Sequence, residues 1–407
     1  MRQSRFAVLR ERDFRLFLIG HGVSFAGDFM LPVALSFAVL EKYNSAGALG
    51  VVLTAHSLPL VLFLLIGGVV ADRAPRRSVL IASDSVSCVM QALAAALLFT
   101  DGWQLWQLAA LEAVRGTAHA FASPTYAGFI PEVASAPRLQ EANALRQVAW
   151  STAQVVGPAL AGVIVVVGGG AVALAVNAAT FGVSALCLLA IPPRPAIERE
   201  QSSMLADLRD GWREFRSRTW LWVVVAQFGV FHLLVLPPIY VLGALVSKTH
   251  YGGAKPWATT LTVLGLGSVV GGLVALHVRV RRPLLVATIC GLGYGLFALM
   301  LAARAPLVAL VGAAALSGAG FAMFGALWET TLMRLIPADK LSRVSAYDWF
   351  GSIALLPIGY AIVGPLAGVF GVSTVLWIAV VTHFVLAAIV LCVPAVTTLR
   401  ADTTMQH

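Results

Sequence analysis

The stretch Gly67–Arg77, "GGVVADRAPRR", stands between two long apolar runs, 47–71 and 78–99. It places one acid and three arginines in a chain that carries few charges elsewhere. Of the 407 residues, 59% are hydrophobic and 12% are charged, whereas a soluble domain carries about 25% charged residues. Because so few polar side chains are available to cover a soluble globule of this size, we expect most of the surface to face lipid.

The apolar runs are long enough to cross a bilayer, which takes about 20 mostly apolar residues per helix. Twelve such runs are present, at 14–40, 47–71, 78–99, 103–130, 143–167, 171–191, 220–246, 257–278, 283–303, 305–333, 344–370 and 372–397. The first is too long for a cleavable signal peptide, so it reads as a retained span. The predicted fold class is an all-α membrane protein with twelve transmembrane helices.

The basic residues predict the orientation of these spans. If the N-terminus is cytoplasmic, 23 Lys and Arg fall in inner segments, and 4 fall in outer ones (Lys42, Lys248, Lys255 and Arg304). Lys and Arg accumulate on the cytoplasmic side of membrane proteins. We therefore expect both termini to be cytoplasmic and the stretch Gly67–Arg77 to form a cytoplasmic turn. The net charge of +9 lies in short loops and forms no basic face, which argues against nucleic acid as a partner.

The longest polar segment, 192–219, separates six runs from six. Its apolar residues Leu205, Leu208, Trp212 and Phe215 recur at helical spacing, which predicts an amphipathic helix at the inner membrane surface. The predicted domains are an N-terminal six-helix bundle (1–191), this linker (192–219) and a C-terminal six-helix bundle (220–407).

The two halves echo each other at an offset of 204–207 residues. "GGVVA" (67–71) matches "GGLVA" (271–275), "RGTA" (115–118) matches "AGFA" (319–322), and "GPALAG" (157–162) matches "GPLAG" (364–368). Two pseudo-symmetric halves favour a transporter with a central site. The charges of Asp28, Asp72 and Arg115 have no like-charged counterpart in the second half. They are therefore candidates for chemistry rather than architecture.

These motifs together resemble the major facilitator superfamily over essentially the whole chain. The opening stretch is similar to that family's pattern Gly-x-x-x-Asp-Arg-x-Gly-Arg-Arg, with Pro75 where glycine is usual. The matched positions are Gly68, Asp72, Arg73, Arg76 and Arg77. "VVGPALAG" (155–162) resembles the Gly-Pro motif of the drug/proton antiporter branch. The stretches 9–35 and 139–162 look like the macrolide-efflux and siderophore-export transporters of that branch. An arginine motif is matched at Arg115, with His119 where glycine is usual.

The resemblance implies a gate on the cytoplasmic side. In such a gate Asp72 lies near the start of the run 344–370, where a helix N-terminus favours an anion, and Arg73, Arg76 or Arg77 pairs with Asp348. Glu329, near the inner end of its run, is a further gate candidate. The alternative for these arginines is a plain positive-inside anchor.

The Gly-Pro motif implies a bend that biases the transport cycle toward export, and a simple kink is the alternative. The helix-bend candidates are Gly157, Pro158 and Gly162 in the first half and Gly364 and Pro365 in the second.

Asp28 is the acid that lies deepest in an apolar run. It stands about 14 residues into the first run, or roughly 21 Å along a helix, where a charge costs at least about 2.5–3.5 kcal/mol. Arg115 is the expected cation, and Glu112 shares its helix face. We hypothesise that Asp28, Arg115 and Glu112 couple a proton to transport. The alternative is a static ion pair that orders the bundle.

Several polar and aromatic residues are candidates to line a substrate cavity. His232 occupies the depth of Asp28 in the second half, although a packing role is the alternative. The other candidates are Gln154, Trp150, Asn177, Gln227, Trp328 and Tyr126, and His21, His56, His277 and His383 carry less weight. No metal site is expected, since the cysteines Cys88, Cys187, Cys290 and Cys392 show no metal or disulfide spacing.

The predicted function is export of amphipathic small molecules, such as drugs, macrolides or siderophore-like metabolites, by proton antiport. The proton gradient is the energy source, and no cofactor is expected. The protein is expected to be a monomer in the bacterial cytoplasmic membrane, with the lipid bilayer and a small-molecule substrate as its partners. An importer or uniporter of a small metabolite is the alternative. An enzyme is disfavoured because no catalytic cluster is seen, and an ATP-driven pump because no P-loop is present. A channel would not explain halves that differ in their charges.

Overall fold

A computed structural model describes residues 7–100, 102–193, 204–278 and 280–400. Every regular element within these residues is helical, which confirms the predicted all-α class for this part of the chain. The chain divides into two compact units, Met1–Arg199 (unit 1) and Glu200–His407 (unit 2).

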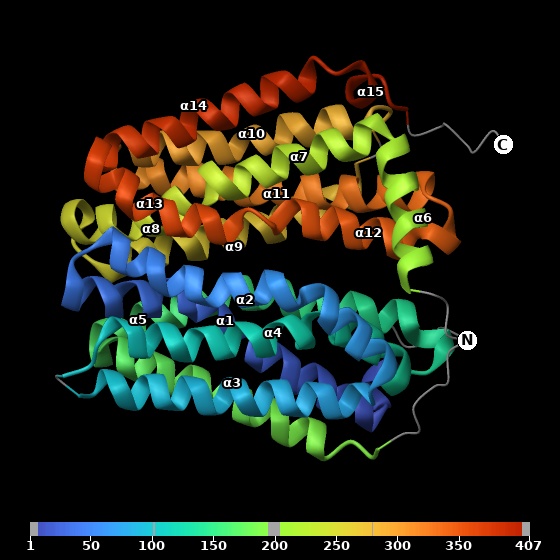
Figure 1. Cartoon of the computed structure of the whole chain (residues 1–407), viewed down its shortest axis with the longest axis horizontal. Coiled ribbons are helices and arrows are strands. Elements are labelled where there is room, and N and C mark those ends of the chain that lie inside the picture. Colours follow the sequence, from blue (N-terminus) through green and yellow to red (C-terminus); the bar gives the residue numbers. More distant parts are fainter. Residues whose placement is uncertain (1–6, 101, 194–203, 279, 401–407) are drawn as a thin grey trace. The chain divides into compact units, whose positions relative to one another are not determined.

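Unit 1 is built from five long helices, α1–α5, which lie side by side in Figure 1. Its elements are η1 (Ala7–Arg10), α1 (Arg12–Tyr43), α2 (Ala46–Arg73), α3 (Arg76–Leu98), α4 (Leu105–Val133), η2 (Ala136–Arg138) and α5 (Leu139–Leu189). The two predicted runs 143–167 and 171–191 form the two arms of α5. They meet at Gly169, whose φ of 75° and ψ of 179° break the helix. Glycine adopts such a positive φ without the steric penalty of a side chain.

Unit 2 contains more and shorter helices. They are α6 (Met204–Ser217), α7 (Thr219–Leu234), α8 (Leu236–Val246), η3 (Ser247–Tyr251), α9 (Ala254–Ala275), α10 (Pro283–Ala302), α11 (Leu307–Leu335), α12 (Ala338–Ile353), α13 (Leu356–Phe370), α14 (Val372–Leu391) and α15 (Pro394–Thr397). Two predicted runs are each divided into two helices, at Val235 and after Ile353. Prolines follow both breaks, and a proline cannot donate the backbone hydrogen bond that a continuous helix needs.

Ten helical segments of the described chain are long and apolar enough to cross a membrane. They are Arg12–Tyr43, Ala46–Gly68, Arg76–Leu98, Ala136–Leu189, Thr219–Tyr251, Ala254–Ala275, Pro283–Ala302, Leu307–Leu335, Arg343–Phe370 and Val372–Leu391. Helix α4 has 29 residues but lies outside this set. It carries Glu112, Arg115 and Glu132 along its length.

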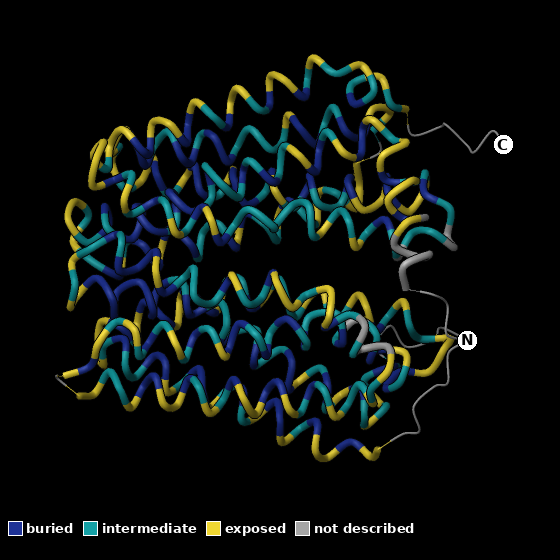
Figure 2. The backbone as a smooth tube through the Cα atoms, in the orientation of Figure 1, coloured by how far each residue is buried: buried dark blue, intermediate teal, exposed yellow. Residues whose placement is uncertain are grey.

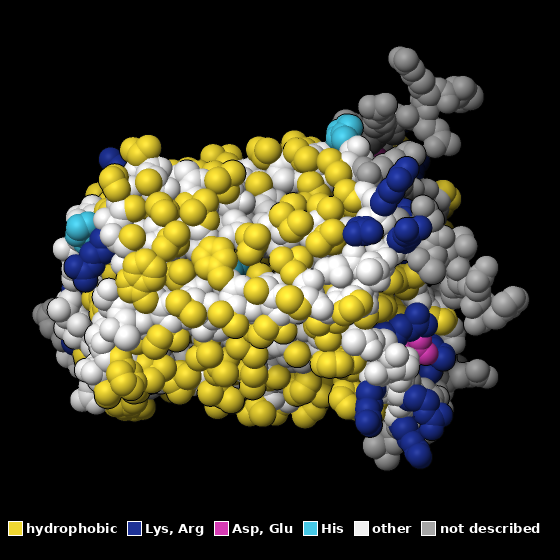
Figure 3. Space-filling view, turned by 90° about the horizontal axis from the view of Figure 1, so that it is seen from above, with side chains coloured by type: hydrophobic (Ala, Val, Ile, Leu, Met, Phe, Trp, Pro, Cys, Tyr) yellow, Lys and Arg dark blue, Asp and Glu magenta, His cyan; other side chains and the backbone are white. Residues whose placement is uncertain are grey.

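The surface is that of a protein immersed in lipid. Large apolar side chains point outward, and Val167 and Val308 are each 84% exposed. Figure 2 shows buried and exposed residues alternating along the same helices, as expected where one face packs and the other meets lipid. On the face drawn in Figure 3, hydrophobic side chains form a broad band, with Lys and Arg gathered beyond its ends. So much exposed apolar surface would drive a water-soluble protein to aggregate.

Helix α6 lies within the segment predicted to be an amphipathic linker and packs on α12 of unit 2. The ring of Trp212 lies 5.4 Å from that of Tyr347. Glu214 accepts hydrogen bonds from Arg218 at 2.7 Å and Lys340 at 3.1 Å. Burial raises the pKa of Glu214, but these hydrogen bonds and charges outweigh burial and lower the pKa below its usual value. The linker residues 194–203 lie outside the described residues.

Glycines bring equivalent helix pairs into close contact in the two units. In unit 1, a Cβ on Gly67 of α2 would collide with the carbonyl oxygen of Ala120 of α4. In unit 2, a Cβ on Gly271 of α9 would collide with that of Ala319 of α11. Gly67 and Gly271 are the first residues of the repeated motifs "GGVVA" and "GGLVA". The repeat seen in the sequence therefore corresponds to a repeated helix contact.

We predict that Gly67→Ala destabilises the protein by about 1–3 kcal/mol, because the added methyl group enters a closely packed seam. The neighbouring Gly68 provides a matched control, since a Cβ there would meet nothing within 4 Å. Gly68→Ala should be neutral or slightly stabilising, because alanine is the better helix former. Thermal unfolding of the two purified variants in detergent measures the difference. Equal midpoints would show that the seam tolerates a methyl group.

Candidate functional site

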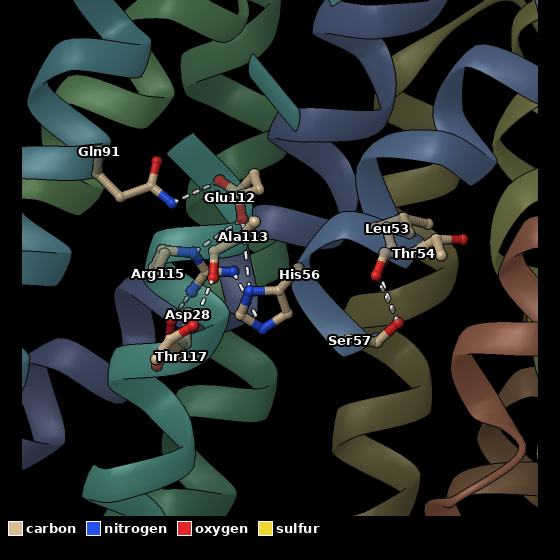
Figure 4. A network of polar contacts seen from close by, with 10 residues as sticks. All are labelled: Asp28, Leu53, Thr54, His56, Ser57, Gln91, Glu112, Ala113, Arg115 and Thr117. Atoms are coloured by element: carbon tan, nitrogen blue, oxygen red, sulfur yellow. Dashed lines mark hydrogen bonds and ion pairs between the residues drawn. The ribbon is translucent and has the colours of Figure 1, made fainter. Parts of the chain in front are cut away.

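A buried ion cluster lies in the interior of unit 1 (Figure 4). Its centre is Arg115 of α4, which is 5% exposed. The Arg115 Nε atom donates to Glu112 Oε2 at 2.9 Å, and Arg115 Nη1 donates to Asp28 Oδ1 at 3.2 Å. The predicted contacts of Arg115 with both acids are therefore present at the same time. One guanidinium holds carboxylates from two helices, α1 and α4.

Two further residues complete the shell around Glu112. Gln91 of α3 donates from Nε2 to Glu112 Oε1 at 3.0 Å. His56 of α2 places Nδ1 3.6 Å from Glu112 Oε2, and its Nε2 lies 3.5 Å from Arg115 Nη2. The cluster thus takes at least one side chain from each of α1, α2, α3 and α4.

The local sequence explains why these groups converge. Glu112, Arg115 and His119 follow a spacing that puts them on one face of α4, and the ring of His119 lies 5.8 Å from that of His56. Gly116 on α4 allows α2 to approach, because a Cβ there would collide with the carbonyl oxygen of His56. The close contact of α2 and α4 therefore brings His56 within reach of the cluster.

The charges within the cluster do not balance. It holds two carboxyl groups, Asp28 and Glu112, and one guanidinium. Isolated charges are expensive to bury, so a site of this composition is neutral only when it also holds one proton or a cationic ligand. The Glu112 side chain is 1% exposed, whereas that of Asp28 is 28% exposed. Asp28 is thus the carboxyl group that a ligand or solvent reaches more easily.

The predicted bend motif lies next to this cluster. Gly157 of α5 packs against α1, since a Cβ there would meet Phe29 and the carbonyl oxygen of Ala26. Pro158 and Gly162 are also buried. In unit 2, Gly364 is half-buried and Pro365 is exposed, both within α13. The first-half motif therefore sets how closely α5 approaches the segment of α1 that carries Asp28.

Two of the predicted gate arginines have partners inside unit 1. Arg76 donates to Gly128 O at 2.9 Å and to Glu132 Oε1 at 3.0 Å. Arg77 donates to the carbonyl oxygens of Leu188 and Leu189, at 3.0 and 2.9 Å. These bonds connect the start of α3 to α4 and to the end of α5.

The remaining gate candidates are spread over both units. Gly68 is half-buried and Arg73 is exposed. Asp72 lies in the last turn of α2, and its side chain is outside the described residues. In unit 2, Asp348 Oδ2 accepts a hydrogen bond from Trp328 Nε1 at 3.0 Å, and Glu329 is exposed. An ion pair between Asp348 and one of the arginines Arg73, Arg76 and Arg77 would connect the two units. This pair stays a prediction.

The four predicted cavity residues of unit 1 lie in different environments. Trp150 packs edge-on against Phe25 and Phe29, with ring centroids 4.6 and 5.0 Å apart, respectively. Asn177 is fully buried, where its Oδ1 occupies the space that a Cβ on Gly27 would take. Tyr126 donates a hydrogen bond to Asp84. Gln154 is half-buried in α5.

In unit 2, the cavity candidates do not form one cluster. Gln227 borders a pocket together with Phe228, Phe231, Tyr294, Phe321, Phe324 and His383. His232 lies outside this lining, and its Nδ1 is 2.8 Å from the carbonyl oxygen of Phe228. Trp328 is buried against Asp348. Of these three candidates, only Gln227 lines the pocket.

Sequence reasoning missed Gln91 and Asp84 and gave His56 little weight. Asp84 was visible as an acid inside the apolar run 78–99, and this signal was overlooked. Gln91 and His56 gave a weaker signal, because a side chain that need not carry a charge costs less to bury in a membrane helix than an ionised acid does. No group of His, Cys, Asp and Glu within the described residues is arranged to hold a metal ion.

Comparison with known proteins adds family evidence to this geometry. The family model of the Major Facilitator Superfamily matches residues 17–347. The multidrug efflux pump Tap of Mycobacterium tuberculosis is 27% identical over 362 residues, which cover 85% of each chain. Macrolide efflux protein A of Streptococcus pyogenes is 22% identical over 364 residues, which cover 87% of this chain and 89% of that protein.

Solved structures of transporters share the fold. The nucleoside transporter NupG superposes with a TM-score of 0.72 at 13% identity, over 93% of this chain and 98% of its own. A bacterial homologue of the iron transporter ferroportin, in an inward-facing state, gives a TM-score of 0.74 at 15% identity, over 96% and 99% of the two chains, respectively. At these identities the likeness concerns the fold alone.

We predict that Arg115→Met destabilises the protein by about 3–5 kcal/mol, because it leaves two carboxyl groups buried without their cation. Adding Glu112→Gln should restore part of this loss, since the double variant buries one charge fewer. Thermal unfolding of the purified proteins in detergent measures both effects.

The control for this comparison is Arg334→Met, which removes an exposed arginine of α11. Arg115→Met with the same midpoint as this control would contradict a central electrostatic role for Arg115.

Proposed function

The chain belongs to the Major Facilitator Superfamily, and from this premise we propose that it exports amphipathic small molecules in exchange for protons. It is a multi-pass membrane transporter whose relatives include efflux pumps. The names of two of these relatives, a multidrug efflux pump and a macrolide efflux protein, support drugs and macrolides as the substrate class. Siderophore-like metabolites have the same amphipathic character.

The observation that carries the proposal is the charge imbalance around Arg115. Asp28 and Glu112 share one guanidinium inside the bundle, so the cluster gains from binding one proton. A cationic or hydrogen-bonding substrate that approaches Asp28 competes with this proton. Binding of one then favours release of the other, which is the thermodynamic requirement of antiport. In this scheme Asp28 exchanges the proton, and Arg115 and Glu112 set its affinity.

The proposed topology has twelve crossings in two pseudo-symmetric six-helix bundles, with both termini cytoplasmic. Helix α5 contains 51 residues, or about 77 Å at 1.5 Å per residue, whereas the hydrocarbon core is about 30 Å thick. Its break at Gly169 is consistent with two crossings. The excess of Lys and Arg in the predicted inner segments supports the orientation, and the bacterial relatives support the cytoplasmic membrane as the location.

We propose that the segment Gly67–Arg77 closes the transporter on the cytoplasmic side. In this proposal Asp72 meets the N-terminal end of α12, with Asp348 and Glu329 as gate residues of unit 2. The bonds of Arg76 and Arg77 to α4 and α5 support a segment that moves together with unit 1. We also propose that α5 bends at Gly157 and Pro158, where Gly157 packs against α1, and that this bend gives α5 a route to act on Asp28.

Transport needs no catalytic chemistry, and in this proposal the proton gradient supplies the energy. A monomer contains both halves and is sufficient for alternating access. The substrate cavity draws on the polar and aromatic residues identified above, with Gln227 of the unit 2 pocket as the first to test. An importer or uniporter on the same fold is the alternative, and the direction of transport decides between them.

We predict that the protein raises the tolerance of an efflux-deficient bacterium to erythromycin, ethidium or related amphipathic compounds. Asp28→Asn should abolish this protection, because asparagine cannot exchange a proton. The control is Glu41→Gln, which changes an exposed acid on the same helix and should leave protection intact. Minimum inhibitory concentrations are compared at matched amounts of protein in the membrane.

Each result has a distinct meaning for the proposal. Protection by both the wild type and Asp28→Asn would retain export and remove Asp28 from the coupling mechanism. Greater sensitivity of the wild type than of the empty vector would reverse the direction and favour an importer.

We also predict that Asp72→Asn abolishes transport while membrane insertion stays normal. The substitution leaves every arginine of the segment in place, so the charges that orient the spans are unchanged. Ethidium efflux and the amount of inserted protein are measured in the same cells. Efflux at the wild-type rate would favour the plain anchor role for this segment.

A further inference from the structure

A second buried carboxyl group lies in unit 1, apart from the cluster around Arg115. Asp84 of α3 is 1% exposed. Its Oδ1 accepts a hydrogen bond from the Tyr126 hydroxyl of α4 at 2.8 Å, and its Oδ2 accepts one from the Ser184 hydroxyl of α5 at 2.6 Å. Its two oxygens are therefore held by two different helices. A polar side chain buried this deeply in a membrane bundle is costly and needs an explanation.

No cation neutralises Asp84 within the part of the chain that the structure describes. The surrounding helices carry further titratable and charged groups on this side of unit 1: Arg76, Arg77 and Cys88 of α3, Arg12, Asp13, Arg15, His21 and Asp28 of α1, Glu112, Arg115, His119, Tyr126 and Glu132 of α4, and Glu141, Arg146 and Cys187 of α5. Arg115 is held by Asp28 and Glu112, and Arg76 is held by Glu132. Arg77 bonds to backbone carbonyls of α5. The described partners of Asp84 are hydroxyl groups.

Hydroxyl partners suit a carboxyl group that gains and loses a proton. A hydroxyl is both a donor and an acceptor. Tyr126 and Ser184 both donate to the carboxylate form of Asp84, and either of them accepts from the acid form after its O–H bond rotates. The site therefore keeps its hydrogen bonds in both states without moving a helix. An arginine or lysine partner, which only donates, would not allow this.

A buried histidine lies beside the same site. His21 of α1 is 3% exposed, and its ring stacks on that of Tyr126 with centroids 3.8 Å apart. Both ring nitrogens of His21 lack a hydrogen-bond partner among the described residues. Unsatisfied polar atoms in a core mark a place for a water molecule or a proton carrier. Among the described residues, Tyr126 thus stands between a carboxyl group without a neutralising cation and an imidazole whose ring nitrogens have no hydrogen-bond partner.

The position of this site along the bundle links it to the first cluster. On α1, His21 precedes Asp28 by seven residues, and on α3, Asp84 precedes Gln91 by seven, about 10 Å in each case. Helix α4 runs in the opposite direction, and there Tyr126 follows Arg115. On each of the three helices, the residue of the Asp84 site therefore lies closer than the residue of the Arg115 cluster to the end of unit 1 that carries Arg76 and Arg77.

Each of these three helices also carries a polar side chain between the two levels. They are Ser24 on α1, Ser87 on α3 and His119 on α4. Ser24 and Ser87 are buried, and His119 has a buried ring nitrogen without a partner. Polar groups thus follow one another from the Asp28 cluster toward the arginine-bearing end.

We propose that Asp84, held by Tyr126 and Ser184, is a second proton-binding site of unit 1. It takes up the proton that leaves the Asp28 cluster and passes it toward the arginine-bearing end, with Tyr126 and His21 beside the path. The relay role rests on the proposed proton antiport, whereas proton binding at Asp84 stands without it. No covalent bond other than O–H is formed or broken, and the proton that Asp28 releases is the one that Asp84 gains.

Infrared difference spectroscopy of the purified full-length protein between pH 5 and pH 8 tests the site directly. A protonated carboxyl group gives a C=O band that shifts in D₂O, and we expect Asp84→Asn to remove one such band. Ser184→Ala and Tyr126→Phe should each move this band to higher frequency, because the acid loses a hydrogen bond. These two variants keep the test valid if Asp84→Asn folds poorly. Wild-type spectra in all three variants would overturn the proposal.

Transport measurements separate this proposal from the proposed function. Ethidium movement driven by a pH gradient is followed in proteoliposomes with wild type, Asp84→Asn and Asp28→Asn. Coupled movement in the wild type that is lost in Asp84→Asn supports the relay. Coupled movement that Asp84→Asn leaves unchanged overturns the relay, while antiport stands. An Asp84 band in a wild type that shows no coupled movement supports proton binding at Asp84 and overturns antiport.

Discussion

The burial of one guanidinium in a membrane bundle is the constraint on which unit 1 depends. Arg115 lies where water is scarce, so its charge must be met by groups from the protein. Asp28 and Glu112 supply the acids, and Gln91 and His56 complete the hydrogen bonding around them. Since these residues come from four helices, a single charge fixes the relative positions of α1, α2, α3 and α4. The excess carboxyl group is the feature on which the proposed proton exchange rests.

Part of this arrangement was visible in the sequence. Charges inside apolar runs are conspicuous, and their absence from the second half separated Asp28 and Arg115 from the repeated architecture. The contact of Arg115 with both acids followed from depth and helix spacing. Asp84 is also an acid inside an apolar run, but its buried site was not predicted. The run 78–99 contributes no residue to the repeat or to the family motifs, so neither pattern singled out Asp84. Gln91 carries no charge and His56 is one of several histidines in the apolar runs, so only the three-dimensional packing shows that both contact Glu112.

The fold was predictable at the level of helices and less so at their boundaries. Apolar runs located most helices, but hydropathy does not distinguish a continuous span from one that breaks, as at Val235. The family pattern drew attention to Gly68, whereas the glycine that α4 packs against is Gly67. The partners of Arg77 are backbone carbonyls, and every residue has one, so no residue pattern marks them. These features depend on geometry between segments that are distant in sequence.

The bonds of Arg77 to Leu188 and Leu189 determine which side chains position 77 accepts, both during membrane insertion and in the folded protein. During membrane insertion only the positive charge matters, and lysine serves as well as arginine. In the folded protein the planar guanidinium donates from two of its nitrogens to two neighbouring carbonyls, a geometry that the single ammonium of lysine does not reproduce. In the proposed orientation, position 77 therefore meets two requirements: a positive charge while the chain is inserted, and the planar shape of arginine in the folded protein. The second requirement is the stricter, because lysine satisfies only the first.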